Sequence, residues 1–546
     1  MSKKVDYSLL LVAAPVEIQK KLFKKYHQSR GKTNIKLLYG GVVSLVATIL
    51  AFFVGVPVVV RLAVQHEFRL QKGSLLWDKW ESIPVPVYLK LRLFNITNPN
   101  AIQDGEKFKL KEVGPYTFEE KRTKTIVEIN EEEDTVTYDE VVHYYFRPEL
   151  SVGSLDDAFT IPNLPYLAVA KIAKDNAVAK IAKDNVHGIT SIPLGLLEFF
   201  GETYTKENVS VRELVFGGME VDATYAPLAQ LSPSSVPTEI EGTQFALLLN
   251  KNGSKTGQWK IKSGIKDIST IGKIVSMDGK SKMDYWADES SPEHQHCNQI
   301  NGSDGTLQAP LVTKDRTMEV FHPILCRSLR FNFNKETSVN GIKAYQFKFP
   351  QDMFASPDKN PANQCFCKKS KYAMNEPCVD GGYYLSACKY GAPIVVTKPH
   401  FADGEKRFFD NVEGLSPGLE SHETEINIEP TTGIPLKASV NLQFNIEIKP
   451  LEGISSFENV PYTMLPIIRA EMTAVLSGET LDMLQSMAIT PLRVAEALKW
   501  ILIISNVFII IAGTWIAAKS RLDNLNREIE NSKKMMELTS IITSHK

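Results

Sequence analysis

Two long apolar stretches without a charged residue dominate the hydrophobic pattern of this chain. They cover residues 37–60 and 500–518, and lysine or arginine flanks each on both sides. A bilayer core is about 30 Å thick and a helix needs about 20 apolar residues to cross it, so the pattern predicts two transmembrane helices. The charged leader before the first stretch is too long, and the stretch itself too extended, for a cleaved signal peptide. The polar, basic segment after the second stretch favours a span over a buried core helix.

The charges at the two ends of the chain predict its orientation. Residues 1–36 carry a net charge of +7 and residues 519–546 carry +2, whereas residues 37–518 carry −10. Because positively charged segments beside membrane helices remain in the cytosol, both tails are predicted to be cytosolic. Residues 61–499 are then one extracellular or lumenal ectodomain. Its acidic character argues against nucleic acid as a partner.

All the cysteines and four N-glycosylation sequons lie within this predicted ectodomain. The acceptor asparagines of the sequons are Asn95, Asn208, Asn252 and Asn301. The six cysteines are Cys297, Cys326, Cys365, Cys367, Cys378 and Cys388. An even number of cysteines confined to residues 297–388 of a non-cytosolic segment predicts three disulfides, and spacing alone leaves their pairing open.

A metal site is the alternative interpretation of part of the cysteine cluster. It would use His294, His296 and Cys297 together with Cys365 and Cys367. The spacing lacks the two-residue knuckle of structural zinc sites, and an oxidising compartment favours disulfides. We therefore expect neither a metal nor another cofactor.

Alternating apolar and polar residues predict antiparallel strands in the ectodomain. Residues 440–448 alternate strictly, which predicts a strand with one buried and one solvent-exposed face. Residues 125–129 and 136–146 flank an acidic run and predict a hairpin with a solvated turn. Further short strands are expected at 259–261 and 265–268. No linker divides this mainly β segment into independent domains.

Helical patterns are concentrated at residues 165–214, where the sequence repeats itself. AVAKIAKDN occupies residues 168–176 and again residues 177–185. Nine residues turn an α-helix through roughly 900°, so on one straight helix the second copy would face away from the first. We expect an interrupted helix, two short helices or a loop that absorbs the duplication.

One motif typical of an enzyme occurs, but its own residues argue against catalysis. Gly414, Ser416 and Gly418 match the G-x-S-x-G nucleophile elbow, in which the residue after the serine donates its backbone N–H to an oxyanion. Here that residue is Pro417, which has no N–H. A turn between strands explains the motif better, and the chain is predicted not to be an enzyme.

Short sequence blocks spread over the ectodomain carry a resemblance to a known family. They are FNITNP (94–99), EVGPYTFEE (112–120), CNQINGSDGT (297–306), CRSL (326–329), FASPDKNP (354–361), CFC (365–367), KPHF (398–401) and IEPTTGIPLKA (428–438). With these blocks the chain resembles the class B scavenger receptor family, which includes the fatty-acid translocase. Lysosomal integral membrane proteins and sensory neuron membrane proteins are relatives in the same family.

The resemblance implies an α+β ectodomain with three features. These are an antiparallel β-barrel-like core, a helical-bundle apex at about residues 160–215, and an internal lipid tunnel that leads toward the bilayer. It also implies the disulfides Cys297–Cys365, Cys326–Cys388 and Cys367–Cys378. Family members capture ligands at the apex, often through basic residues. The candidate contacts are therefore Lys171, Lys174, Lys180 and Lys183, for which solvated lysines on an exposed helix are the alternative.

The function implied by the resemblance is that of a scavenger-type receptor in the plasma membrane. Such a receptor binds lipids or lipid-bearing particles, namely fatty acids, sterols, carotenoids, lipoproteins or lipid-like odorants, and passes the hydrophobic ligand through its tunnel to the membrane. One alternative is a sensory neuron membrane protein that delivers odorants to a chemoreceptor. Another is an endosomal or lysosomal trafficking receptor with a protein cargo. That alternative is favoured by possible sorting signals in the two tails. The spacing of an acidic dileucine signal is matched by Glu537, Ile541 and Ile542 in one tail and by Asp6, Leu10 and Leu11 in the other.

Overall fold

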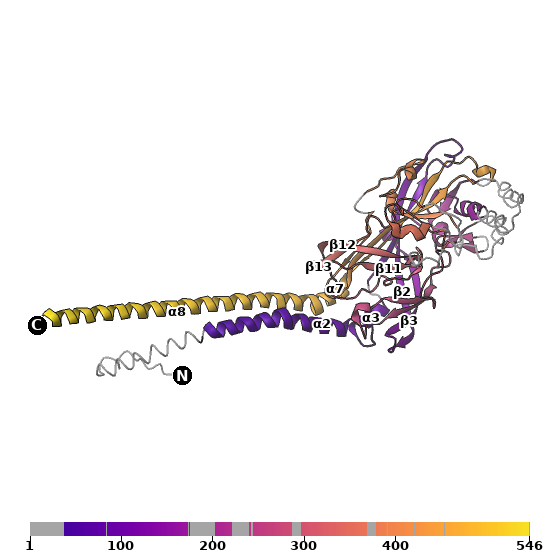
Figure 1. The fold of residues 1–546 in the computed structure, drawn as a ribbon. Helices are drawn as coiled ribbons and strands as arrows, with labels where there is room; N and C mark the ends of the chain where they lie inside the picture. Colours follow the sequence, from indigo (N-terminus) through magenta and orange to yellow (C-terminus); the bar gives the residue numbers. More distant parts are fainter. Residues whose placement is uncertain are drawn as a thin grey trace. The chain divides into compact units, whose positions relative to one another are not determined.

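The chain divides into a helical unit and a β-sheet unit, as seen in a computed structural model (Figure 1). The helical unit comprises Met1–Ala63 and Leu484–Lys546, and the sheet unit comprises Val64–Met483. The structure describes residues 36, 38–82, 85–172, 174, 203–220, 240–241, 244–286, 296–367, 378–389, 391–418, 422–451 and 454–544.

The two predicted spans are confirmed as two long apolar helices. Leu38–Glu67 and Gly478–Glu537 are each long and apolar enough to cross a membrane. The first continues from residue 38 through a π-helical turn, η1 (Ala51–Gly55), into α2 (Val56–Glu67). The second consists of α7 (Gly478–Leu484), η12 (Gln485–Ile489) and α8 (Thr490–Ser544). Both helices extend beyond the apolar stretches because their polar flanking residues continue the helical backbone.

Small and polar residues hold the two apolar helices together inside the helical unit. A Cβ on Gly41 would lie 3.0 Å from the side chain of Ile510, so glycine permits this close approach. Thr48 lies about two helical turns after Gly41 on the first helix. Its Oγ1 accepts a hydrogen bond of 3.1 Å from Nδ2 of the buried Asn506 on the second helix. In a membrane such a bond is one of the few interactions that favours pairing of helices over contact with lipid.

Fourteen strands form the main sheet of the second unit. Their bounds are β1 (Val87–Ile96), β2 (Phe108–Asn130), β3 (Thr135–Phe146), β9 (Ser254–Lys262), β10 (Ile274–Met277), β11 (Met318–His322), β12 (Arg327–Val339), β13 (Ile342–Lys348), β14 (Gly382–Tyr384), β15 (Ile394–Thr397), β16 (Val412–Glu413), β17 (Glu425–Ile428), β18 (Pro435–Ile448) and β19 (Thr463–Val475). The main path runs β10-β9-β3-β2-β1-β19-β18-β17-β13-β12-β11, and β14, β15 and β16 attach beside it. Every pair is antiparallel except β16 with β2.

The predicted barrel is not closed among the residues that the structure describes. β10 and β11 are the two ends of the strand order and do not pair with each other. Among the described residues between them, the strand pairing consists of isolated bridges such as Lys282 with Gln299 and Ser303 with Val320. The core is therefore a large open sheet, because an irregular segment occupies the position where further strand pairing would be needed.

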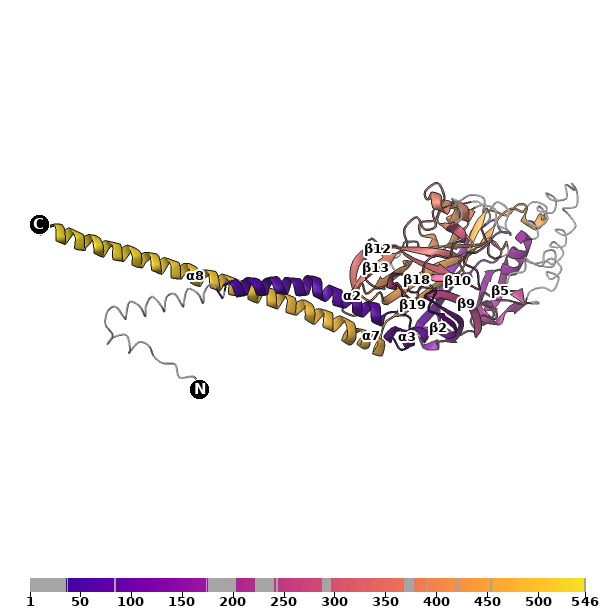
Figure 2. The ribbon, with the colours of Figure 1, turned by 60° about the horizontal axis from the view of Figure 1, so that its bottom comes forward.

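Two strand predictions had opposite outcomes. The hairpin is confirmed, since β2 and β3 pair from Phe118 with Phe146 to Asn130 with Thr135 (Figure 1). The solvent-exposed face predicted for residues 440–448 is wrong. Its polar residues Asn441, Gln443, Asn445 and Glu447 are all buried. β18 is a central strand of the sheet and pairs with β19, β17 and β15 (Figure 2), and other parts of the chain cover these side chains.

The segment predicted as a helical apex is only partly described, and it is not helical throughout. Residues 164–172 form a helix, but β5 (Thr205–Ser210) is a strand that pairs with β4 (Ala158–Pro162). Most of the 168–185 repeat lies outside the described residues. The remaining short elements are α3 (Leu75–Glu81), η2 (Pro148–Leu150), η4 (Glu213–Gly217), β6 (Met219–Glu220), β7 (Ile240–Glu241), β8 (Gln244–Phe245), η5 (Ile268–Thr270), η7 (Pro361–Cys367), η8 (Pro399–Phe401), η9 (Lys406–Phe409) and η11 (Ser455–Phe457).

Candidate functional site

Charged and polar side chains form a buried surface on three central strands of the sheet unit. Gln443 of β18 and Arg92 of β1 lie directly opposite Arg469 of β19. Residues opposite each other in antiparallel strands point to the same face. Gln443 is fully buried and Arg469 is 5% exposed, so this row of polar side chains lies inside the protein.

The cations on this surface share two carboxylates. Arg92 Nη1 bonds Glu471 Oε2 at 2.8 Å, and Lys90 lies 3.5 Å from the other oxygen. Arg469 Nε lies 3.1 Å from Glu112 Oε1. Burial would raise the pKa of Glu112, but the hydrogen bond from His400 and the charge of Arg469 outweigh it and hold the pKa below its usual value. Three cations and two carboxylates leave this surface with an excess positive charge.

His400 is held in one orientation by three neighbours. Its backbone N–H donates to Gln443 Oε1 at 2.6 Å, and its Nδ1 accepts from the Ser416 N–H at 3.2 Å. Its Nε2 lies 3.4 Å from Glu112 Oε2. Because Nδ1 accepts a hydrogen bond, these contacts assign a ring proton to Nε2, the nitrogen that faces Glu112. The backbone of His400 has φ +53°, a conformation that costs energy in a non-glycine residue and that the surrounding contacts must maintain.

The G-x-S-x-G segment contacts this histidine without forming a serine hydrolase triad. In such a triad a histidine nitrogen accepts a proton from the serine hydroxyl. Here His400 Nδ1 already accepts the backbone N–H of Ser416. Gly414 has φ +92°, and a Cβ there would lie 2.1 Å from the Leu110 carbonyl oxygen. A close approach of two backbones therefore explains this glycine.

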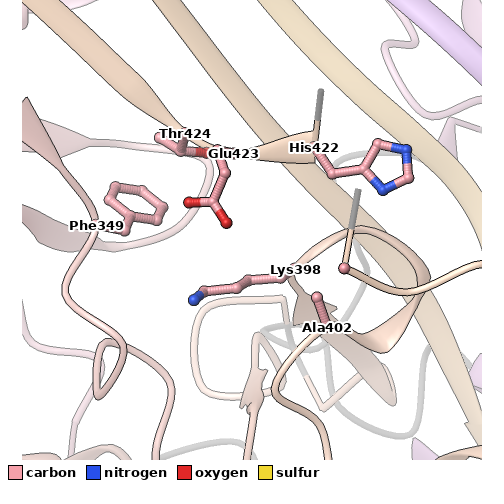
Figure 3. A pocket seen from close by; sticks show the side chains of 7 residues that line it. Phe349, Lys398, Ala402, His422, Glu423 and Thr424 are labelled. Atoms are coloured by element: carbon pink, nitrogen blue, oxygen red, sulfur yellow. The ribbon is translucent and has the colours of Figure 1, made fainter. Parts of the chain in front are cut away.

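A second histidine, His422, packs on the first. The two rings are nearly parallel, with centroids 4.7 Å apart. Burial lowers the pKa of His422 to about 4, and the charge of Arg469 lowers it further, so the His422 ring is neutral at physiological pH. His422 lines a small cavity of about 20 Å³ together with Phe349, Lys398, Ala402, Gly418, Glu423 and Thr424 (Figure 3).

A separate buried cluster lies on β2 and β3. Arg122 bonds Glu120 Oε1 at 2.5 Å and lies 3.3 Å from Glu140 Oε2. The fully buried Lys124 ammonium donates to the Trp80 carbonyl at 3.2 Å and lies over the Trp80 ring. Burial lowers the pKa of Lys124. The interior of the sheet unit is therefore amphipathic, with apolar clusters beside ion pairs.

The lysines predicted to contact ligand are not all accessible. Lys171 is 5% exposed, whereas Lys174 is half-buried. Lys180 and Lys183 lie outside the described residues. A solvated position is therefore wrong for Lys171, since the helix at 164–172 packs against the apolar core. Ligand contact by these lysines stays a prediction.

The six cysteines form three disulfides. Cys297 pairs with Cys365, Cys326 with Cys388, and Cys367 with Cys378, which is the pairing that the family resemblance implies. His296 Nε2 lies 3.5 Å from Cys365 Sγ and 3.7 Å from Cys297 Sγ. Because metals bind the cysteine thiolate, these disulfide sulfurs are unsuited to the metal site considered above. His294 lies outside the described residues.

The four sequon asparagines differ in accessibility. Asn208 and Asn252 are exposed, and Asn208 lies at the strand β5 with φ +57°. Asn95 and Asn301 are half-buried, and Asn95 Oδ1 accepts the Thr160 N–H at 2.9 Å. Attachment of a glycan requires the side-chain amide nitrogen to be reachable, which favours Asn208 and Asn252.

Sequence reasoning missed the polar surface because it assigned the polar side of β18 to solvent. One signal was present. Three of the four polar positions are amides, and long charged side chains are the usual choice for a strand face in water. The other contributors, His400 and His422, stand at or near the resemblance blocks KPHF and IEPTTGIPLKA, to which no role was assigned.

Two long apolar helices, one before and one after a large antiparallel sheet in the sequence, indicate an integral membrane protein with two spans. The chain belongs to the CD36 family, whose family model matches residues 38–517. This match covers the first apolar helix, the whole sheet unit and the second apolar helix as far as residue 517.

Individual relatives with different roles are equally similar to the chain. Sensory neuron membrane protein 2 of Manduca sexta is 30% identical over 499 residues, 88% of this chain and 93% of the relative. Scavenger receptor class B member 1 of Bos taurus is 30% identical over 428 residues, 78% of each chain. Lysosome membrane protein 2 of Homo sapiens is 30% identical over 460 residues, 84% of this chain and 89% of the relative. Because all three relatives have the same sequence identity to this chain, the identity does not indicate which of their roles it shares.

Proposed function

We propose that this protein is a membrane receptor that binds lipids or lipid-bearing particles and delivers the hydrophobic ligand to the bilayer. The observation that carries the proposal is the CD36 family match across residues 38–517. Relatives named as scavenger receptors match over most of this chain. The proposed ligands are fatty acids, sterols, carotenoids, lipoproteins or lipid-like odorants.

In the proposed mechanism the protein lowers the barrier to lipid transfer and makes no covalent bond. Each CH₂ group of a lipid costs about 0.8 kcal/mol when it enters water, so a protected internal passage favours transfer. The amphipathic interior of the sheet unit supports such a passage, because apolar clusters would accept the chain and polar groups the head. Both tails are proposed to be cytosolic and the protein to reside in the plasma membrane.

The test is lipid uptake by cells that express the full-length protein. Uptake of a fluorescent fatty acid and of labelled cholesteryl ester from lipoprotein should exceed that of cells without the protein. Lys174→Glu should reduce capture by reversing the charge at the proposed apex. Lys273→Glu, an exposed lysine outside the apex, is the matched control and should leave uptake unchanged. Uptake equal to that of non-expressing cells, with normal surface amounts, would contradict the proposal.

Residence in endosomes or lysosomes is the second candidate, and the tail sequence favours it. Ile541 and Ile542, preceded by Glu537, lie in α8, and their spacing is that of an acidic dileucine signal. In expressing cells, Ile541→Ala with Ile542→Ala should move an endolysosomal protein to the surface. A protein that is already at the surface, and unaffected by the change, supports the receptor function instead. Enhanced responses of a co-expressed chemoreceptor to odorant would favour the sensory role.

A further inference from the structure

The part of α8 that follows the second apolar stretch carries an exposed apolar stripe. The stripe consists of four large side chains that are 50–66% exposed, namely Leu522, Leu525, Ile529 and Met536. Because they recur every three or four residues, they lie along one face of the helix. No other described helix or strand lies beside this part of α8 (Figure 1 and Figure 2). A helix in water gains most of its stability from packing of its apolar face, so this stripe indicates a partner.

The spacing of the stripe is that of a coiled coil. With Leu522 at position a of a seven-residue repeat, positions a and d of residues 519–537 are Leu522, Leu525, Ile529, Ser532 and Met536. Every other residue of this segment is polar or charged except Met535. Isoleucine at a and leucine at d favour two parallel strands. The stripe therefore suits one partner helix of the same kind.

The stripe continues on the face of α8 that the first apolar helix leaves free. Within the span, Asn506 and Gly513 are buried against the first helix, where Asn506 bonds Thr48. Residues two positions apart on a helix point about 200° away from each other, so Phe508 and Trp515 face away from the first helix. These two residues continue the a positions of the stripe and are 71% and 64% exposed. A second helix can therefore pack along α8 without displacing the first.

The charges beside the stripe fit a second copy of this chain. In a parallel coiled coil, the residue at position g of one helix meets the residue at the next position e of the other helix. In two copies in register, Glu528 at g therefore meets Lys533 at e, once on each side of the stripe. Both side chains are exposed and reachable by a partner. The preceding pair is Arg521 with Asn526, so no like charges meet. Two copies cross a membrane in the same direction, which makes these segments parallel.

A membrane surface fits the stripe less well than a second copy does. To lie on the membrane, the chain would have to bend after the span, and sharp bends in helices arise at proline, at glycine and serine pairs or at π-bulges. α8 is one helix from Thr490 to Ser544, and residues 514–544 contain no proline or glycine. Residues 519–537 carry five cations and four carboxylates. Helices that bind anionic lipids instead have a polar face rich in lysine and arginine.

We propose that residues 519–537 of α8 bind the same residues of a second copy of this protein as a parallel, two-stranded coiled coil. The apolar stripe forms the seam, and Glu528 of each copy pairs with Lys533 of the other. The pairing holds two copies of the protein side by side in the membrane. This inference is independent of the lipid function, because it concerns only the segment that follows the second span.

The first experiment detects the seam by cross-linking of the full-length protein in isolated cell membranes. All six native cysteines are paired in disulfides, so a cysteine introduced at position 525 or 524 supplies the reactive thiol. Leu525→Cys, at position d, should give a covalent dimer on mild oxidation with copper phenanthroline. Asn524→Cys, at the outward-facing position c, is the matched control and should remain a monomer. Equal cross-linking of the two variants, or none in either, overturns the proposal.

The second experiment tests the pairing of charges. The fraction of dimer is counted from the bleaching steps of single fluorescently tagged full-length molecules at low density in the membrane. Glu528→Lys places lysines opposite each other and should cause a loss of dimer, whereas adding Lys533→Glu to it should restore the dimer. Asp523→Lys makes the same change of charge on the outward face and should leave the fraction unchanged. A fraction of dimer that is equal in Glu528→Lys and Asp523→Lys overturns the proposal.

Two further variants separate this interface from other occupants of the stripe. Ile529→Asp places a charge in the seam and should give a monomer. A dimer that persists in Ile529→Asp is held together elsewhere and overturns the proposal. Deletion of residues 1–30 should leave the dimer intact. A protein that forms dimers only after this deletion has its stripe covered by its own N-terminal segment, which also overturns the proposal.

Discussion

Replacing Gln443 by leucine should destabilise the ectodomain much more than the same substitution at a surface position. Gln443 is fully buried, accepts the His400 N–H at 2.6 Å and donates to Asn445 Oδ1 at 2.7 Å. Leucine is one atom shorter and has no polar atom, so both partners would lose their hydrogen bonds. Each buried polar group left without a partner costs about 1–3 kcal/mol. The expected loss is therefore about 2–6 kcal/mol, the sum of two such costs.

The effect can be expressed as a change in unfolding temperature. Unfolding entropy is about 2.1 cal/mol/K per residue, or about 0.9 kcal/mol/K for a unit of about 420 residues. Gln443→Leu should then lower the midpoint by roughly 2–7 °C. The measurement is the temperature at which half of the purified full-length protein loses its folded signal, at one fixed heating rate because unfolding of large proteins is often irreversible.

The control for this prediction is Gln258→Leu on β9. Gln258 is exposed and donates to Asp139 Oδ1 at 3.2 Å. Surface substitutions usually change stability by less than about 0.5 kcal/mol, so its midpoint should stay near that of the unaltered protein. Equal midpoints for the two variants would refute the conclusion that β18 carries a buried hydrogen-bond network.

Three further predictions concern other parts of the molecule. Asn506→Leu removes the hydrogen bond to Thr48 and should weaken the association of the two apolar helices by about 0.6–1.7 kcal/mol. The measurement is the separation of the two helices induced by detergent, and Ser505→Ala, at an exposed position, is the control. The pKa of His422 in the folded protein, about 4, lies below the usual value, so unfolding at acid pH is accompanied by binding of a proton. The free energy of unfolding should therefore decrease as the pH is lowered from about 6.5 to about 4, and it should decrease less in His422→Phe. An acid stability profile that is identical in the two proteins contradicts this assignment. Asn208→Gln and Asn252→Gln should each remove one glycan, seen as faster gel migration that glycosidase treatment abolishes; unchanged migration would show an unmodified site.

The elements with the strongest periodic signals were predictable. The two apolar helices follow from runs of uncharged residues, because an isolated span can satisfy its own backbone inside a bilayer only as a helix. The β2–β3 hairpin follows from two alternating strands joined by an acidic turn. In both, the information lies within a few neighbouring residues, and the structure adds only the bounds and the register.

The outcome was different wherever burial depends on distant segments. Period-two alternation shows that the two faces of β18 differ, but it does not show what covers the polar face. That cover comes from η8 and from residues near His422, and one of its contacts is the bond from His400 to Gln443. Lys171 is a second example, because its helix is packed by residues far away in the chain. The failure of the barrel to close is a third example. Whether β10 and β11 pair depends on how strands far apart in the chain meet, and the local spacing of residues does not predict this.

The pairing of β1 with β19 determines when the ectodomain can finish folding. The ion pair between Arg92 and Glu471 joins residues 379 positions apart, and β19 is the last strand before the second apolar helix. At about 5–20 residues per second, synthesis takes roughly 20–80 s to cover that interval. During this time β1 has no partner on one edge, and its cations have no carboxylate from β19. A nascent chain of this protein must therefore be protected from aggregation until nearly all of the sheet unit has been synthesised. Premature termination before residue 463 should yield a product that quality control removes.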